Sequence, residues 1–179
     1  MVAMMKRLWL LIALLTLFGC KQTERRAQSP DAQQTATGTE VGARMPDYSA
    51  MNLDGSKFEL GSKRGRVVLV NLWATWCGPC RFEIPELQRI HDRYAPRGFE
   101  VIGVSVDESG VESVRQFMAE QKMTYPIAID PQGNLATILQ TSVLPTSVVL
   151  DRNGKIVWKR YGLIPENDPE LKSAIEKSL

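Results

Sequence analysis

The chain has 179 residues, enough for one domain, and its 44% hydrophobic and 23% charged residues are typical of a globular protein. Its formal net charge is +2, and Lys6 and Arg7 are the only charged residues before Cys20, so the remainder holds 20 basic and 20 acidic residues. Such a balance lacks the basic excess of nucleic-acid-binding proteins, and no nucleic acid is expected as a partner.

Residues 1–19 have the pattern of a secretion signal. Two basic residues precede the apolar run Leu8–Phe18, whose eleven residues are too few for a membrane span of about 20. The next motif, Leu17-Phe18-Gly19-Cys20, resembles a bacterial lipobox, and this resemblance implies that Cys20 becomes the acylated N-terminus. Phe18 is larger than the residue usual at this position, a departure that concerns the efficiency of signal cleavage and not the prediction of export. An uncleaved anchor and a cleaved signal without lipid are the alternatives.

Residues 20–45 are interpreted as the acylated cysteine and a flexible linker, because they are rich in Gln, Thr, Ala, Ser and Arg. A flexible chain of this length reaches about 25–30 Å. Lys21 stands where Gram-negative lipoproteins kept in the inner membrane typically have Asp, which favours the outer membrane in a cell with two. Residues 46–179 are expected to form one folded domain.

The domain is expected to begin with a β-hairpin over residues 48–60, with a type I′ turn at Asp54-Gly55. Residues 66–72 follow as a continuous apolar run, which indicates a central parallel strand covered on both faces. The later pattern predicts helix 78–95, strand 99–106, helix 110–122, strand 126–130, helix 133–139, strands 146–150 and 155–158, and helix 169–178. This order predicts an α/β fold with a mixed central sheet.

The motif Trp76-Cys77-Gly78-Pro79-Cys80 lies between the central strand and the first helix. A helix N-terminus stabilises an anion, so the pKa of a thiol placed there falls and its thiolate becomes a nucleophile. Residues three apart on a helix are close enough to form a disulfide. We therefore expect Cys77 to be an exposed nucleophile and Cys80 a buried resolving thiol. Gly78 and Pro79 form the turn, because proline fits the first helical turn.

Residues 67–85 resemble the active-site region of the thioredoxin superfamily, including Pro85 within the following helix. The resemblance covers about residues 45–178 and implies a thioredoxin fold and thiol–disulfide oxidoreductase activity. The N-terminal hairpin and an extra strand and helix, a central βα insertion, are similar to the membrane-tethered TlpA/ResA-like branch. A structural disulfide or half of a zinc site is the alternative for the cysteines, but a four-thiolate site needs a second pair.

Leu144-Pro145-Thr146 resembles the cis-proline loop of the superfamily, which implies that these residues face the cysteines and bind the substrate. Trp76 is expected to shield the sulfurs and contact the substrate, with plain core packing as its alternative. The TlpA/ResA-like branch often has a carboxylate at the position of Glu83, which implies that it tunes the thiols and moves protons. Its alternative is a solvated helix residue. Asn71 stands where thioredoxins have a buried Asp, and an amide is no general base.

Three further residues receive structural interpretations. Trp73 is expected in the core, and His91, on the apolar stripe of its helix, is expected to be packed or half exposed without a metal or catalytic role. Asp107, which follows a strand with Glu108, is expected to cap the next helix.

The sequence therefore predicts a membrane-tethered oxidoreductase outside the cytoplasm that needs no cofactor. The Gly-Pro pair matches the reducing thioredoxins, so we expect it to reduce disulfides of exported proteins, apocytochrome c among them by resemblance to relatives. A membrane thiol carrier is expected as its electron donor. A Cu(I)-handling lipoprotein that uses the same cysteines is the first alternative. An antioxidant peroxidase is the second.

Overall fold

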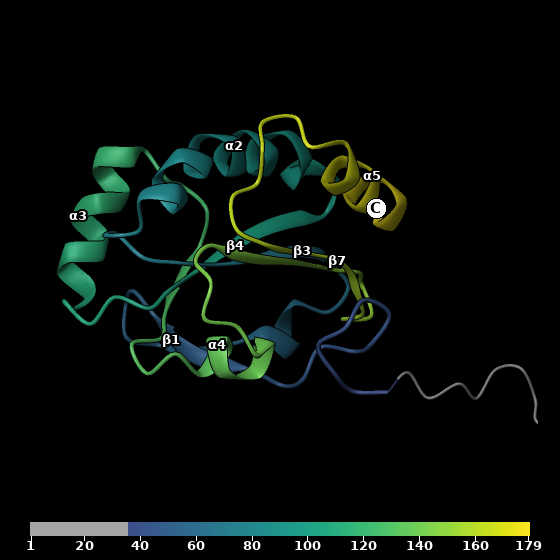
Figure 1. Ribbon diagram of the computed structural model, residues 1–179, viewed down its shortest axis with the longest axis horizontal. Helices are drawn as coiled ribbons and strands as arrows, with labels where there is room; N and C mark the ends of the chain where they lie inside the picture. Colours follow the sequence, from purple (N-terminus) through teal and green to yellow (C-terminus); the bar gives the residue numbers. More distant parts are fainter. Residues whose placement is uncertain (1–35) are drawn as a thin grey trace, which may run out of the picture. The chain divides into compact units, whose positions relative to one another are not determined.

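A seven-stranded mixed sheet lies at the centre of the fold (Figure 1). The structure is a computed structural model and describes residues 36–179. The expected signal segment, Cys20 and the first part of the expected linker lie outside the described residues. Within residues 36–179, no helix has both the length and the apolar character that crossing a membrane requires.

The elements follow the predicted order along the chain. The strands are β1 (Ser49–Asn52), β2 (Lys57–Glu59), β3 (Val67–Trp73), β4 (Phe99–Ser105), β5 (Ile127–Ile129), β6 (Thr146–Leu150) and β7 (Ile156–Tyr161). The helices are α2 (Gly78–Tyr94), α3 (Val111–Gln121), α4 (Asn134–Leu139) and α5 (Pro169–Ser178), with 3₁₀ turns η1 (Leu60–Lys63) and η2 (Ala95–Arg97).

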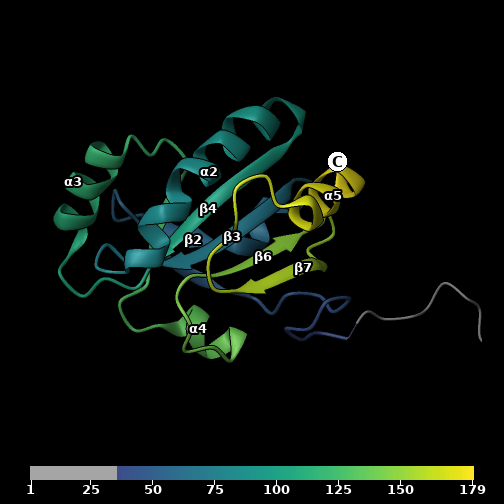
Figure 2. The ribbon, with the colours of Figure 1, turned by 45° about the horizontal axis from the view of Figure 1, so that its top comes forward.

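The strand order is β2-β1-β5-β4-β3-β6-β7, which places β3 in the interior of the sheet. β3 runs parallel to β4 and antiparallel to β6, and Figure 2 shows β6 and β7 beside it. All seven residues of β3 are buried, because helices cover both faces of the sheet at this strand. The continuous apolar run thus forms the predicted central strand, and the predicted α/β fold with a mixed central sheet is confirmed.

Alternate side chains of β3 pack into two hydrophobic cores, one on each face of the sheet. Val67, Leu69 and Trp73 pack with residues of α2 and α5, which lie together on one face in Figure 1. Val68 and Val70 pack on the other face with residues of α4 and η1. The cysteines belong to the first core. The start of α2 is therefore fixed to the end of β3 by well-packed apolar contacts.

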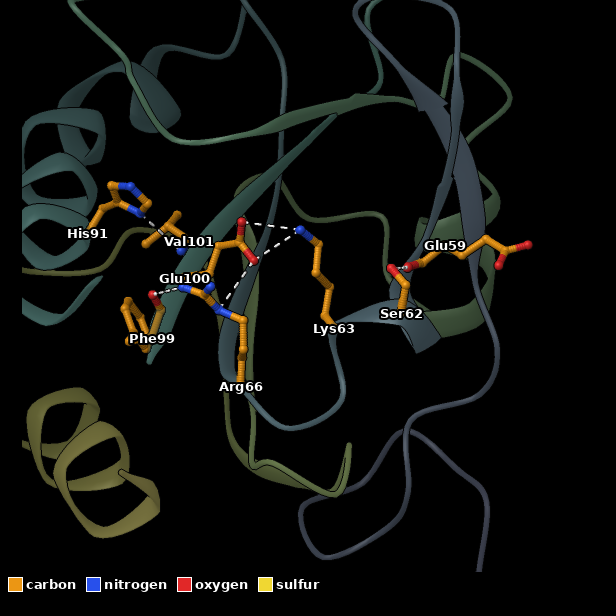
Figure 3. Close-up of polar contacts among 8 residues, drawn as sticks. All are labelled: Glu59, Ser62, Lys63, Arg66, His91, Phe99, Glu100 and Val101. Carbon is orange, nitrogen blue, oxygen red and sulfur yellow. Dashed lines mark hydrogen bonds and ion pairs between the residues drawn. The ribbon is translucent and has the colours of Figure 1, made fainter. Parts of the chain in front are cut away.

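The opposite end of the parallel strands is fixed by polar contacts (Figure 3). The Nζ of Lys63 lies 3.2 and 3.1 Å from the two carboxylate oxygens of Glu100, and Arg66 donates to the carbonyl of Phe99 at 3.0 Å. His91 accepts the backbone N–H of Val101 at 3.3 Å through its Nδ1, which satisfies a strand donor. His91 is half-buried, as its place on the helix stripe predicts.

Two local expectations were wrong. The hairpin between β1 and β2 does not have a type I′ turn, because only Gly55 of the pair Asp54-Gly55 has a positive φ. Instead, the Asp54 carboxylate accepts hydrogen bonds from the backbone N–H and hydroxyl of Ser56, which closes a longer turn. Asp107 does not cap α3, since Gly110 is the N-cap residue and makes no side-chain cap bond.

Residues 37–45 lie along the start of β7. Gly42 donates its N–H to the carbonyl of Ile156 at 2.8 Å, and Ile156 donates to Ala43 at 2.9 Å. Met45 is buried and donates to the carbonyl of Gly154 at 2.9 Å. These bonds attach the last part of the segment interpreted as a linker to the domain, and they cover part of an otherwise exposed strand edge.

Candidate active site

The two cysteines lie where β3 passes into α2. Cys77 is the N-cap residue of α2, and its Sγ accepts the backbone N–H of Cys80 at 3.2 Å. The two residues form a disulfide with an S–S distance of 2.05 Å and a Cα–Cα distance of 5.3 Å. Pro79 occupies the first turn of the helix, where its missing N–H leaves no bond unmade. The geometry places Cys77 at the positive end of the helix dipole.

Both cysteines are buried in this oxidised form. Cys80 is completely buried, as expected for a resolving thiol, whereas Cys77 is only 6% exposed. The expectation of an exposed Cys77 was therefore wrong for the disulfide state. The cause is the disulfide itself together with the N-cap position, which hold the Cys77 sulfur against the helix start.

Trp76 is 69% exposed, which excludes the core-packing alternative for this residue. Trp73, three residues earlier, is fully buried as predicted. Phe82 is 81% exposed one turn into α2, a residue that the sequence reasoning did not select. An apolar residue in a helix is ordinarily expected to be buried, so the sequence alone did not indicate that Phe82 is exposed. Large exposed apolar side chains thus lie on both sides of the disulfide in the sequence.

The bond between Leu144 and Pro145 is cis, as the resemblance implies. Thr146 pairs with Leu72 in the sheet, so this loop lies beside the end of β3 and next to the turn that leads to the cysteines. The Pro145 carbonyl accepts the N–H of Gly162 at 2.7 Å. Leu144 packs against the core that contains both cysteines. The structure thus brings the proline loop and the cysteine turn to the same end of β3.

Thr146 is completely buried, and its hydroxyl donates to the carbonyl of Val143 at 2.7 Å. A buried side chain makes no contact with a bound protein. We therefore propose that Thr146 shapes the loop, while its neighbours contact the substrate.

Glu83 is only 1% exposed, which excludes the solvated-helix alternative. Its Oε1 accepts the side-chain N–H of Asn71 at 2.7 Å, and its Oε2 accepts the backbone N–H of Ile164 at 2.8 Å. Burial raises the pKa of Glu83 to about 7, although both hydrogen bonds favour the charged form and oppose the shift. A carboxyl with this pKa exchanges protons near neutral pH.

Asn71 also has a second acceptor. Its amide donates to the hydroxyl of Ser147 at 2.9 Å, across the paired strands β3 and β6. The Tyr125 hydroxyl is buried nearby, and burial together with the charge of Glu83 raises the pKa of Tyr125. Asn71 therefore acts here as a donor that orients Glu83 and not as a base.

The connection between β7 and α5 is held by two carboxylates of α2. Besides the bond from Ile164 to Glu83, the N–H of Asn167 donates to Glu86 at 3.0 Å. Figure 2 shows this connection beside α2. Sequence reasoning missed these contacts because the residues in each pair are 81 positions apart.

The chemistry of this site is that of two thiols that form and break a disulfide beside a buried carboxyl. Comparisons with known proteins agree with it. A model of the Redoxin family matches residues 40–175. The thiol-disulfide oxidoreductase ResA of Bacillus thuringiensis subsp. konkukian is 33% identical over 123 residues, which cover 69% of this chain and 70% of the relative. The thioredoxin-like protein YneN of Bacillus subtilis is 35% identical over 137 residues, which cover 75% of this chain and 79% of the relative.

Comparison with solved structures confirms the expected thioredoxin fold. A secreted thiol-disulfide isomerase from Corynebacterium glutamicum matches 83% of this chain and 93% of its own, with a TM-score of 0.69 and 28% identity. A thiol:disulfide interchange protein of the thioredoxin family from Chlorobium tepidum matches 80% and 99%, with a TM-score of 0.61 and 27% identity.

Proposed function

Because this chain belongs to the Redoxin family and is a ResA-like thiol–disulfide oxidoreductase of the thioredoxin superfamily, we propose that it reduces disulfides of exported proteins outside the cytoplasm. The observation that carries the proposal is the Cys77–Cys80 disulfide at the start of α2, with the nucleophile position at the helix cap and the second sulfur buried. We propose roles for the individual residues that agree with this geometry.

In the reduced enzyme, the Cys77 thiolate attacks one sulfur of the client disulfide. A bond forms between Cys77 and that sulfur, and the other client sulfur leaves as a thiolate that takes up a proton. The thiolate of Cys80 then attacks the Sγ of Cys77, which releases the second client thiol and forms the Cys77–Cys80 disulfide. Two electrons pass from the enzyme to the client.

Glu83 is proposed as the proton acceptor for Cys80. Cys80 is fully buried in the disulfide form, and Glu83 lies three residues further along the same helix, where it is a closer acceptor than bulk solvent in the proposed mechanism. The raised pKa of about 7 suits a group that accepts a proton and returns it near neutral pH. Asn71 and Ile164 keep the carboxylate in place by bonds to its two oxygens.

The client is proposed to bind across Trp76 and the loop that contains Leu144 and Pro145. An exposed apolar side chain adjoins each segment in the sequence, since Trp76 precedes Cys77 and Val143 precedes Leu144. Leu163, which is also exposed, lies next to the residue bonded to Glu83. By resemblance, the backbone of Leu144 pairs with the extended client chain.

The proposal places the protein at a membrane, held by a lipid on Cys20, with the domain facing the periplasm or the cell exterior. The support is the lipobox-like motif and the apolar segment before it. An enzyme that reduces disulfides there needs a supply of electrons, and we propose a membrane thiol carrier as the donor. Apocytochrome c, whose CxxCH motif contains two cysteines, is the client that resemblance to relatives suggests for testing.

Trapping of the client intermediate tests the assignment of the two thiols. In the full chain, Cys80→Ser leaves Cys77 able to attack but removes the resolving thiol, so a mixed disulfide with a disulfide-bonded test protein accumulates. Cys77→Ser serves as the matched control and forms none. Accumulation with Cys77→Ser instead would reverse the two roles.

The direction of electron flow is tested by the reduction potential of the Cys77–Cys80 pair. Thioredoxin has a reduction potential of about −270 mV, and the oxidant DsbA has one of about −120 mV. We expect a value close to the reducing end. A value near the oxidising end would make the protein an oxidase or isomerase with the same fold and site.

The Cu(I) alternative assigns the same two cysteines to metal binding, since thiolates are soft ligands that suit Cu(I). Copper titration of the reduced chain separates the two functions, because a copper-handling protein binds Cu(I) tightly and leaves test disulfides intact.

A further inference from the structure

The turn between β3 and α2 is attached to the end of β4 by a single buried carboxylate. Asp107, which is 1% exposed, accepts the backbone N–H of Thr75 at 2.9 Å through Oδ2. Its Oδ1 accepts the Thr75 hydroxyl. One carboxylate therefore fixes both the backbone and the side chain of the residue two positions before Cys77.

The carboxylate is itself held in place by its own strand end. The hydroxyl of Ser105 donates to the Oδ2 of Asp107 at 2.7 Å, and the N–H of Asp107 donates back to that hydroxyl at 3.1 Å. Val106 donates its N–H to the carbonyl of Trp73 at 3.0 Å. These bonds make the segment after β4 a rigid support for the cysteine turn.

Asp107 binds the cysteine turn before α2 and does not cap α3, the helix that follows it in the sequence. An acidic residue between a strand and a helix commonly caps the helix, yet α3 begins at Gly110 without any side-chain cap. Burial of a carboxylate is costly unless hydrogen bonds compensate it. Here three of them do, and two come from Thr75.

We propose that Thr75 and Asp107 form a positioning brace that keeps Cys77 at the start of α2, where its thiolate is reactive. The proposal rests on the assignment of Cys77 as the nucleophile. Within the turn, Cys77 donates its N–H to the carbonyl of Ala74 at 3.2 Å, so Thr75 lies inside a closed loop whose end is the nucleophile. Movement of Thr75 therefore moves Cys77 relative to the N–H groups of the helix.

The expected consequence concerns the thiol pKa of Cys77. The helix dipole stabilises a negative charge at a helix N-terminus. If the brace is lost and Cys77 moves away from the helix start, part of this stabilisation disappears and the thiol pKa of Cys77 rises. Because the dipole effect on a single charge is modest, we expect a rise of about half a pKa unit.

The experiment measures alkylation of Cys77 by iodoacetamide as a function of pH in the full chain with Cys80→Ala. This substitution removes the second thiol of the pair, and mass spectrometry of the separate peptides distinguishes Cys77 from Cys20. In this parent, Thr75→Val removes the hydroxyl at nearly constant shape, Thr75→Ala repeats the loss without a branched side chain, and Thr75→Ser retains the hydroxyl.

We expect the alkylation midpoint of Cys77 to rise by about half a pH unit in Thr75→Val and Thr75→Ala, and to return to the parental value in Thr75→Ser. An unchanged midpoint in both hydroxyl-free variants overturns the brace, even if their denaturation midpoints fall, because a merely structural bond affects stability alone. A parental midpoint at the ordinary value of a free thiol, about 8.5, overturns the assignment of Cys77 and the brace together.

Discussion

The side-chain amide of Asn71 donates to the Oε1 of Glu83 at 2.7 Å, in the interior of the domain. An amide in this position leaves Glu83 as the titrating partner, with a pKa of about 7 because burial disfavours its charge. This arrangement supports the proposal that Asn71 is a fixed hydrogen-bond donor and that Glu83 accepts the proton.

The first prediction concerns catalysis by Glu83. Glu83→Gln keeps the shape and a hydrogen-bond acceptor but no longer takes a proton, so we expect reduction of a test disulfide to slow about 100-fold, the lower end for general acid–base catalysis. We expect the wild-type rate to rise with pH near 7, where Glu83 loses its proton, and this inflection to be absent from the variant. Glu86→Gln, the same change one turn further along α2, is the matched control and keeps the inflection.

The second prediction uses Asn71 to shift the same titration. Asn71→Asp places two carboxyl groups within hydrogen-bond distance, and these groups do not both ionise at neutral pH. We expect the pH at which the rate rises to move upward by about one unit or more. Ser147→Ala removes the other acceptor of the Asn71 amide and leaves this midpoint within a few tenths of a unit. A midpoint unchanged in Asn71→Asp would show that the inflection belongs to another group.

The third prediction concerns stability of the oxidised form. The pKa of Glu83 is raised from 4.5 to about 7 in the folded state, so between these values the folded state binds more protons than the unfolded state. Stability from this group is complete below about pH 4.5 and is lost as pH rises through 7. The total loss is about 3 kcal/mol, at about 1.4 kcal/mol per pKa unit.

Urea denaturation of wild type and Glu83→Gln at pH 5 and pH 8 measures this loss. The variant does not titrate, so the difference between the two proteins isolates Glu83 from the other ionisable groups. We expect the variant to gain stability relative to wild type by about 2–3 kcal/mol between pH 5 and pH 8. A relative loss over that interval would mean that the folded state lowers the pKa.

How much of this site the sequence predicts depends on the distance between the partners along the chain. The cysteine turn and the bounds of α5 follow from local patterns, and α5 spans the predicted residues 169–178. The burial of Glu83 and its bond to Ile164 depend on how β7 and α5 pack against α2, which no local pattern encodes.

The contact between Asp107 and Thr75 illustrates the same limit at a shorter range. The two residues are 32 positions apart and meet because β3 and β4 are parallel neighbours whose ends coincide. The sequence shows an acidic residue after a strand, for which helix capping is the ordinary interpretation. Only the pairing of the strands reveals that the cysteine turn is the nearer partner.

The fourth prediction concerns the attachment of α5. Asp168 caps this helix by accepting the N–H of Leu171 at 2.8 Å, and its other oxygen lies 2.6 Å from Arg160. Asp168→Ala loses both contacts and should lower the free energy of unfolding by about 2 kcal/mol. Asp168→Asn keeps the cap and loses the ion pair, so its cost is about half. Equal costs in urea denaturation would contradict a separate contribution from the cap.

The fifth prediction concerns the close contact between β4 and the buried Trp73. A Cβ on Gly103 would overlap the Cδ1 of Ile127 and would lie 2.8 Å from the Nε1 of Trp73, whose indole is fully buried and packs against Phe117. Gly103→Ala therefore forces the Ile127 side chain and either the indole or the strand to move, at a cost of about 1–3 kcal/mol for overpacking. Since Trp73 ends β3 just before the cysteine turn, its displacement should also lower the rate of disulfide reduction. Gly61→Ala, where nothing lies within 4 Å of the new Cβ, is the matched control and should change neither quantity measurably. If both variants unfold at the wild-type urea concentration, the contact at Gly103 is not tight.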